Sequence, residues 1–99
     1  MRKPKYRISA KAVEDLEQIW EFTSKKWSVE QADRYYKLII DEIEFIAGNR
    51  TNEKSNEHIK EGYKVSIAKS HLIFFKRNKD IAEIIRILHQ RMDVESKFK

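Results

Sequence analysis

The sequence of 99 residues contains no cysteine, one proline and two glycines. Without cysteine, neither a disulfide framework nor a thiolate metal site can form. Two glycines are too few for a glycine-rich loop that cradles a phosphate group. No apolar run reaches the roughly 18 residues of a membrane span, and the basic N-terminus lacks the apolar segment of a secretory signal. We therefore expect a cytoplasmic protein without a cofactor and without contact with a membrane.

The net charge of +5 is unevenly distributed along the chain. Residues 1–11 contain five Lys or Arg and no acid, residues 12–59 contain six against eleven acids, and residues 60–99 contain ten against five. If the middle segment is helical and the ends form strands, the sheet is basic and the helices are acidic. A basic sheet attracts a polyanion or an acidic protein segment. A solvated basic surface without any partner explains the charge equally well.

Two helices are predicted in the first half of the chain. Residues 10–26 have apolar side chains at the spacing i, i+3, i+4, i+7, and Ser9 suits the N-cap of this helix. Ser28, with Gln31 three residues later, forms the capping-box pattern of a second helix, which Gly48 ends. So few residues separate the two helices that they should fold back on each other as a helical hairpin. The Trp and Tyr side chains of both helices are expected in the core.

The second half of the chain carries the pattern of a sheet. Residues 49–61 are polar and without period, which indicates a surface loop. Alternating or short apolar runs predict strands, and residues 78–80 form the turn of a hairpin. The predicted strands are 5–9, 63–67, 71–77 and 81–89. One domain over residues 1–99 is expected, of the α+β class, in the order β-α-α-β-β-β, with the helical hairpin on one face of a small, mainly antiparallel sheet.

Common catalytic and metal-binding patterns are missing. His58, His71 and His89 do not have the short spacing that metal ligands usually show, so we expect no metal site. Pairing about the predicted turn places position 71 opposite position 87, which would bring His71 and His89 close but not directly opposite each other. No serine lies in a glycine-framed nucleophile elbow.

The last predicted strand ends in a polar cluster that allows two interpretations. Strict alternation would place Ile85, Ile87, His89 and Arg91 on one side of the sheet. In one interpretation the strand simply leaves the core and enters solvent. In the other, the charged end is directed at a partner, because the Arg fork can donate two parallel hydrogen bonds to a phosphate or a carboxylate.

Two separated segments resemble the ParE toxin family. The segment "YRISAKAVEDLEQIWEFTSKKWSVEQADRYY" contains the pattern Ala-x-x-Asp-Leu-x-x-Ile-Trp followed by Trp-x-x-x-Gln-Ala-x-x-Tyr. The segment "EGYKVSIAKSHLIFFKRNKDIAEIIRILHQRMD" has the Gly-Tyr-Lys strand, the aromatic hairpin and the Ile-Leu-His-x-Arg-Met-Asp ending of that family. The resemblance covers roughly residues 6–93. It implies a bacterial type II toxin of the ParE/RelE superfamily, neutralised by a ParD-like antitoxin.

Within this superfamily the resemblance implies two different activities. ParE relatives poison DNA gyrase and are not known catalysts, whereas RelE relatives cut messenger RNA in the ribosome. RNA cleavage needs a base, an acid and cationic stabilisation of the phosphorane, which RelE-type toxins supply with several Lys or Arg side chains and a C-terminal Tyr. Only Lys64 and Arg91 match these positions, while Ser66 and Phe98 replace a Lys and the Tyr. We therefore expect a gyrase inhibitor that is not an enzyme, with a ribonuclease that uses Lys64 and Arg91, or a toxin that retains only antitoxin binding, as alternatives.

The resemblance also implies two binding surfaces. The antitoxin would occupy apolar grooves between the helices and the sheet, and would add a strand to a sheet edge. The target would meet the C-terminal end of the last strand, and no direct specificity for nucleic acid is expected. The expected target-binding residues are His89, Arg91, Met92 and Asp93, and the expected antitoxin-binding residues are Trp20, Tyr36, Lys64 and Phe75.

Overall fold

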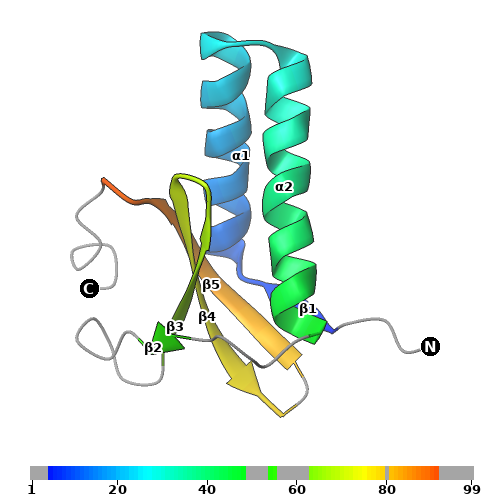
Figure 1. The fold of residues 1–99 in the computed structure, drawn as a ribbon, viewed down its shortest axis with the longest axis vertical. Helices are drawn as coiled ribbons and strands as arrows, with labels where there is room; N and C mark the ends of the chain where they lie inside the picture. Colours follow the sequence, from blue (N-terminus) through cyan, green and yellow to red (C-terminus); the bar gives the residue numbers. More distant parts are fainter. Residues whose placement is uncertain (1–4, 49–53, 56–62, 80, 92–99) are drawn as a thin grey trace.

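The protein folds into a layer of two helices on a five-stranded sheet (Figure 1). The computed structural model describes residues 5–48, 54–55, 63–79 and 81–91. The elements are β1 (Tyr6–Ile8), α1 (Ala10–Lys26), α2 (Val29–Gly48), β2 (Lys54–Ser55), β3 (Lys64–Ala68), β4 (His71–Asn78) and β5 (Ile81–His89). The predicted α+β class and element order are confirmed, with β2 as a short addition inside the region that was predicted as a loop. None of the helices in these ranges is both long enough and apolar enough to cross a membrane.

Both helices begin where their capping residues predict. The Ser9 hydroxyl accepts a hydrogen bond from the Ala12 N–H at 3.0 Å, and α1 starts at the next residue. The Ser28 hydroxyl accepts one from the Gln31 N–H at 3.1 Å, and α2 follows directly. These side chains satisfy backbone donors that have no partner in the first turn of a helix. The short connection between the caps turns the helices into the expected hairpin.

The sheet is mixed, in the order β1-β5-β4-β3-β2. β1 pairs parallel with β5, while the three other pairs are antiparallel. The pairing of β2 with β3 ends at Val65. Residues 66–68 of β3 therefore form an edge that meets no further strand within the described part of the chain.

The core lies between the helices and the sheet. Apolar side chains from α1, α2 and the central strands pack together there, including Leu16, Ile39, Ile43, Ile73, Phe75 and Ile84. Phe75 is only 1% exposed. This burial corrects the prediction that Phe75 belongs to an antitoxin-binding surface, because a side chain enclosed between two layers cannot meet a partner.

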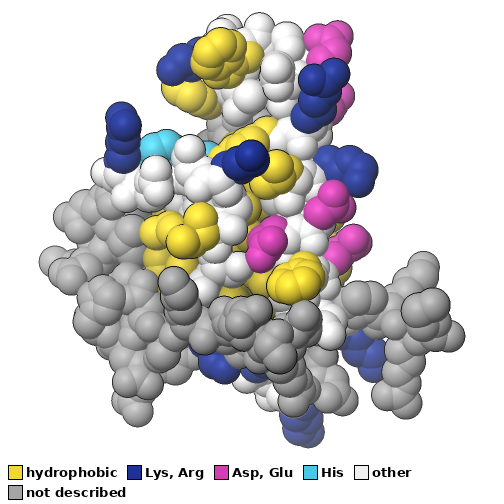
Figure 2. Space-filling model, in the orientation of Figure 1, with side chains coloured by type: hydrophobic (Ala, Val, Ile, Leu, Met, Phe, Trp, Pro, Cys, Tyr) yellow, Lys and Arg dark blue, Asp and Glu magenta, His cyan; other side chains and the backbone are white. Residues whose placement is uncertain are grey.

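Several large apolar side chains remain on the surface. Figure 2 shows hydrophobic side chains on the helical hairpin and beside the sheet, next to basic and acidic groups. The most exposed are Phe22, Trp27, Val29, Phe45 and Ile67. Trp27 is 69% exposed and Tyr36 41%, so the prediction that the Trp and Tyr side chains of the helices lie in the core is wrong for these two.

The register between β4 and β5 differs from the predicted one. Asn78 pairs with Ile81 across a tighter turn than expected, in which Lys79 has a positive φ of 58°. A bulge then adds Ile85 to β5 without a partner in β4. Together these two features place His71 directly opposite His89, instead of opposite position 87.

The bulge is held by side chains from the beginning of the chain. Ser9 donates its N–H to the carbonyl of Ile84 at 2.9 Å and its hydroxyl to that of Ile85 at 2.8 Å. Asp15 accepts the N–H of Ile87 at 3.0 Å. Because the extra residue shifts the alternation by one position, Ile84 and Ile87 both pack in the core, and the predicted strict alternation is wrong beyond Ile84.

Candidate functional site

A cleft of about 750 Å³ lies between the helical hairpin and the end of the sheet where β4 begins and β5 finishes. Figure 1 shows that the hairpin extends past the sheet on this side, so that part of α1 overhangs the strand ends. Ile19, Phe22 and Trp27 from the helical side and Ile87 from β5 form its apolar walls. We call this space the hairpin cleft. Its volume is in the range of about 300–1,000 Å³ that is usual for binding pockets.

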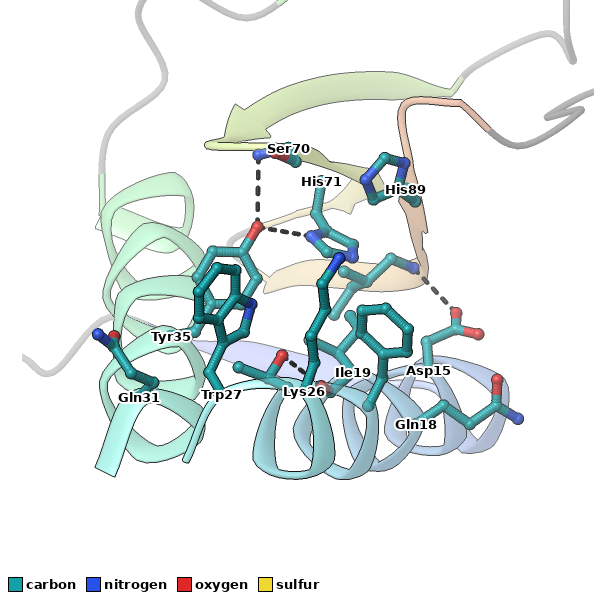
Figure 3. Close-up of a pocket in the computed structure, with 13 residues that line it drawn as sticks. Asp15, Gln18, Ile19, Lys26, Trp27, Gln31, Tyr35, Ser70, His71 and His89 are labelled. Atoms are coloured by element: carbon teal, nitrogen blue, oxygen red, sulfur yellow. Dashed lines mark hydrogen bonds between the residues drawn. The ribbon is translucent and has the colours of Figure 1, made fainter. Parts of the chain in front are cut away.

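Two histidines form the sheet side of the hairpin cleft (Figure 3). His71 and His89 are paired across β4 and β5, and their ring centroids lie 5.2 Å apart in an edge-to-face arrangement. The Tyr35 hydroxyl, from α2, shares a hydrogen bond of 2.6 Å with Nδ1 of His71. Ser70 donates its backbone N–H to the same hydroxyl at 3.3 Å. Tyr35 therefore holds the His71 ring in place from the helical side.

Burial shifts the pKa values of His71 and Tyr35. The pKa of His71 is lowered to about 4, chiefly by burial and secondly by the charge of His89, while Asp15 acts in the opposite direction. His71 is thus neutral at pH 7. Burial also raises the pKa of Tyr35, so that its hydroxyl keeps its proton. Tyr35 and His71 therefore carry no charge at pH 7.

Asp15 closes the base of the hairpin cleft. It is 8% exposed and accepts two hydrogen bonds from the Arg86 guanidinium, at 2.8 and 2.9 Å. Its bond to the Ile87 N–H anchors the same carboxylate to β5. The hydrogen bond to Asp15 raises the pKa of Arg86. Asp15 is the one carboxylate among the described residues that line the cleft, and Arg86 neutralises it.

The helical wall of the cleft carries exposed aromatic side chains and a cation. Phe22 is 64% exposed and Trp27 is 69% exposed. The Lys26 ammonium lies 5.6 Å from the Phe22 ring centroid and 5.9 Å from that of Trp27. In Figure 3, Lys26 extends from α1 toward His71. A partner with an apolar anchor and a negative charge would find complementary groups on this wall.

Arg91 lies just beyond the cleft, at the end of β5. It is exposed, and its role in binding a target stays a prediction. Its backbone N–H donates to Nδ1 of His89 at 3.1 Å, and the N–H of Gln90 donates to the carbonyl of Ser70 at 2.9 Å. We call Gln90 and Arg91 the Arg91 tip. Met92 and Asp93, which were predicted to act with it, lie outside the described residues.

A second, shallower groove of about 560 Å³ separates α2 from β3. Its exposed apolar side chains are Phe45, from α2, and Ile67, from β3. At the same boundary Ser66 donates its hydroxyl to Glu42 at 2.6 Å. The groove runs beside the edge of β3 that begins after Val65. We call it the outer groove. A segment could fill it and add a strand to β3 at the same time.

The predicted antitoxin-binding residues differ in their exposure. The Trp20 indole is half-buried and donates to Asp33 at 2.9 Å, so it joins α1 to α2. Tyr36 is 41% exposed on α2, Lys64 is half-buried in β3, and Phe75 is in the core. Trp20 and Lys64 expose part of their surface, and their role in binding stays a prediction.

The two residues of the ribonuclease alternative are not brought together. Lys64 begins β3, while Ala68, four residues later, is level with His71 and His89. Four strand residues span roughly 13 Å, and Arg91 follows His89. The structure therefore separates Lys64 from Arg91 along the strand direction. Within the described ranges, no group of three His, Cys, Asp or Glu side chains gathers in a way that could hold a metal ion.

The reasoning from sequence expected apolar grooves between the helices and the sheet but did not identify the residues that line the hairpin cleft. Its two histidines face each other because of the bulge, which no local pattern reveals. One signal was present, because Phe22 does not fit the apolar spacing of the first helix. An aromatic residue on the polar face of an amphipathic helix is a candidate for a binding surface.

Comparisons with known proteins agree with this architecture. The family model described as "ParE toxin of type II toxin-antitoxin system, parDE" matches residues 6–94. Toxin ParE1 of Caulobacter vibrioides is 35% identical over 91 residues, which cover 92% of this chain and 94% of that protein. Toxin ParE1 of Mycobacterium tuberculosis is 34% identical with the same coverage. A chain of the solved chromosomal ParDE TA system from P. aeruginosa has the same fold, with a TM-score of 0.76 at 16% identity over 88% of this chain and 96% of that one.

Proposed function

Because this chain belongs to the ParE family of toxins from type II toxin–antitoxin systems, we propose that it inhibits DNA gyrase in the cytoplasm and is neutralised by a ParD-like antitoxin. Inhibition acts by binding, without a chemical step. The proposal requires two surfaces, one for the target and one for the antitoxin.

The exposed position of Arg91 is the observation that carries the proposed contact with gyrase. Its side chain extends from a strand end whose backbone is anchored at two points, by the Gln90 N–H and by its own N–H. A guanidinium in a fixed position can form charge-assisted hydrogen bonds with carboxylates on another protein at a small entropic cost. The Arg91 tip is therefore the proposed target contact.

The antitoxin is proposed to bind along both grooves. The hairpin cleft offers Phe22, Trp27 and Lys26 to an acidic segment with apolar anchors. The outer groove offers Ile67 and Phe45 beside the edge of β3, where an added strand would find backbone partners. Helix-in-groove binding and strand addition are both common ways to recognise a peptide.

The ribonuclease alternative receives less support from the geometry. A general acid–base mechanism needs its groups within hydrogen-bonding reach of one substrate. Lys64 and Arg91 stand at different levels of the sheet, and the Ser66 hydroxyl, at the position of the second Lys, is bonded to Glu42. These features favour action by binding.

Substitution of Arg91 tests the proposed function. A hydrogen bond to a charged group contributes about 1.5–3 kcal/mol, so Arg91→Ala should raise the concentration that half-inhibits supercoiling by purified gyrase about tenfold or more. Arg7→Ala, which removes an exposed arginine from β1, is the matched control and should leave inhibition unchanged.

Expression of the wild-type toxin without antitoxin should cause filamentation and DNA breaks before any loss of translation. Rapid message cleavage that depends on Lys64 and Arg91 would instead identify a ribonuclease. The absence of any growth defect, together with a tight antitoxin complex, would identify a toxin that has retained only binding.

A further inference from the structure

We propose that the His89 ring couples the hairpin cleft to the Arg91 tip, so that a partner that fills the cleft disorders the tip and thereby silences it. This inference rests on the proposed function, because it assumes that Arg91 meets the target. It adds a positioning residue and a route by which an occupant of one site acts on the other.

His89 belongs to both sites. Its ring lines the hairpin cleft and lies edge-to-face against His71. On its other side, Nδ1 accepts the backbone N–H of Arg91, two residues further along. This contact resembles an Asx turn, in which an Asn or Asp side chain accepts a hydrogen bond from the backbone N–H two residues later. A ring that moves in the cleft therefore removes the acceptor from the Arg91 tip.

The two histidines differ in their freedom to move. His71 is held by the Tyr35 hydroxyl at 2.6 Å, and Tyr35 is itself bonded to Ser70. His89 is half-buried at the end of β5 and is followed by two exposed residues. When a side chain of a partner enters the cleft, we therefore expect the His89 ring to move, while the His71 ring stays in place.

The occupant that fits this cleft is an acidic peptide segment with an apolar anchor. Phe22 and Trp27 provide exposed aromatic surface, and Lys26 provides a cation between them. The carboxylate of Asp15 is already neutralised by Arg86, so it does not repel an acidic partner. Such a segment would contact the face of His89 that lines the cleft, and it would not cover Arg91 itself.

Two substitutions of His89 separate its two contacts. His89→Phe keeps an aromatic ring against His71 but removes the acceptor for the Arg91 N–H. His89→Asn removes the ring from the cleft but keeps an acceptor that can reach the N–H two residues on. A role in packing alone would favour the Phe variant, whereas the proposed positioning role favours the Asn variant.

Amide hydrogen exchange of Arg91, followed by NMR in the free protein, measures the contact directly and requires no gyrase. A hydrogen bond of about 1 kcal/mol slows exchange about fivefold. We expect His89→Phe to accelerate exchange of the Arg91 amide by about this factor and His89→Asn to restore slow exchange. Gyrase inhibition should follow the same order, with the Asn variant at least threefold more potent than the Phe variant.

The absence of cysteine allows the cleft to be filled with a defined probe. Gln18→Cys places a single thiol at the cleft, where a pyrene maleimide can attach. Glu44→Cys, at an exposed position of α2 that does not line the hairpin cleft, carries the same label. Each labelled protein is compared with its unlabelled form. The label at position 18 should accelerate Arg91 exchange about fivefold and weaken gyrase inhibition, and the label at position 44 should change neither.

The inference is overturned if His89→Phe or the label at position 18 leaves the exchange of Arg91 within twofold of its reference. It is also overturned if His89→Phe inhibits gyrase as well as His89→Asn. If Arg91→Ala inhibits gyrase as strongly as the wild type, the proposed function fails, while the exchange measurements still decide whether cleft and tip are coupled.

Discussion

Removal of the Asp15 carboxylate should be among the most destabilising single changes in this protein. Asp15 and Arg86 have side chains only 9% and 17% exposed, and they meet through two hydrogen bonds. Asp15→Ala removes the carboxylate that binds the Arg86 guanidinium and accepts the Ile87 N–H. Breaking one side of a buried ion pair costs about 3–5 kcal/mol. A domain of this size has a free energy of unfolding of about 5–15 kcal/mol.

Urea denaturation measures this loss. With an m-value of about 1–3 kcal/mol/M, a loss of about 4 kcal/mol lowers the urea midpoint by more than about 1 M. Asp41→Ala is the matched control, because Asp41 forms an ion pair with Lys37 in which the side chains are 57% and 76% exposed. Such pairs contribute only about 0.3–0.5 kcal/mol. Asp15→Asn keeps an oxygen that can accept the Ile87 N–H. Its loss in free energy of unfolding should therefore lie between the losses of Asp15→Ala and Asp41→Ala.

The reasoning would be refuted if Asp15→Ala and Asp41→Ala lowered the free energy of unfolding by the same amount. That result would mean that water or a rearranged side chain fully replaces the contacts that Arg86 makes with Asp15. The double variant Asp15→Ala/Arg86→Met then serves as a further check, because removal of both charges should recover part of the loss of Asp15→Ala.

Two other predictions concern acid stability and the core. Because the pKa of His71 is lowered from 6.5 to about 4, the unfolded chain binds more protons than the folded one in that range, and the free energy of unfolding should fall as pH falls from about 6.5 to about 4. His71→Phe should flatten this part of the profile measured by denaturation at each pH, and an unchanged slope would contradict the assignment. Phe75→Ala should cost about 3–5 kcal/mol because Phe75 is 1% exposed. Phe45→Ala, at 52% exposure, should cost less than about 1 kcal/mol, so equal urea midpoints would contradict the placement of Phe75 in the core.

Local signals were sufficient to predict the helices. Ser9 and Ser28 each bind a backbone N–H three residues later, so the capping information lies within one turn of the helix it starts. The apolar spacing then indicates the buried face. The approximate limits of β3, β4 and β5 were predicted for a similar reason, because a run of apolar or alternating residues is also a local property.

Strand register was not predictable in the same way. The bulge at Ile85 depends on Ser9, which is 76 residues away, and on Asp15, which binds the N–H of Ile87 from 72 residues away. One added residue reverses the facing of every later side chain in the strand. The prediction therefore placed Arg91 just beyond the last strand but missed that His89 pairs directly with His71 on the sheet side of the hairpin cleft. Burial of Phe75 was missed because an apolar residue in a central strand can face either layer.

The parallel pairing of β1 with β5 has a consequence for how the chain is made. β1 leaves the ribosome well before β5, the strand with which it pairs, since Tyr6–Ile8 joins Ala82, Glu83 and Ile84. Until then α1 and α2 are without the sheet that covers their apolar face, and the charged end that follows β5 has not been translated. Synthesis therefore delays assembly of the sheet until β5 has been translated, and a chaperone or a binding protein can meet the nascent chain before that point.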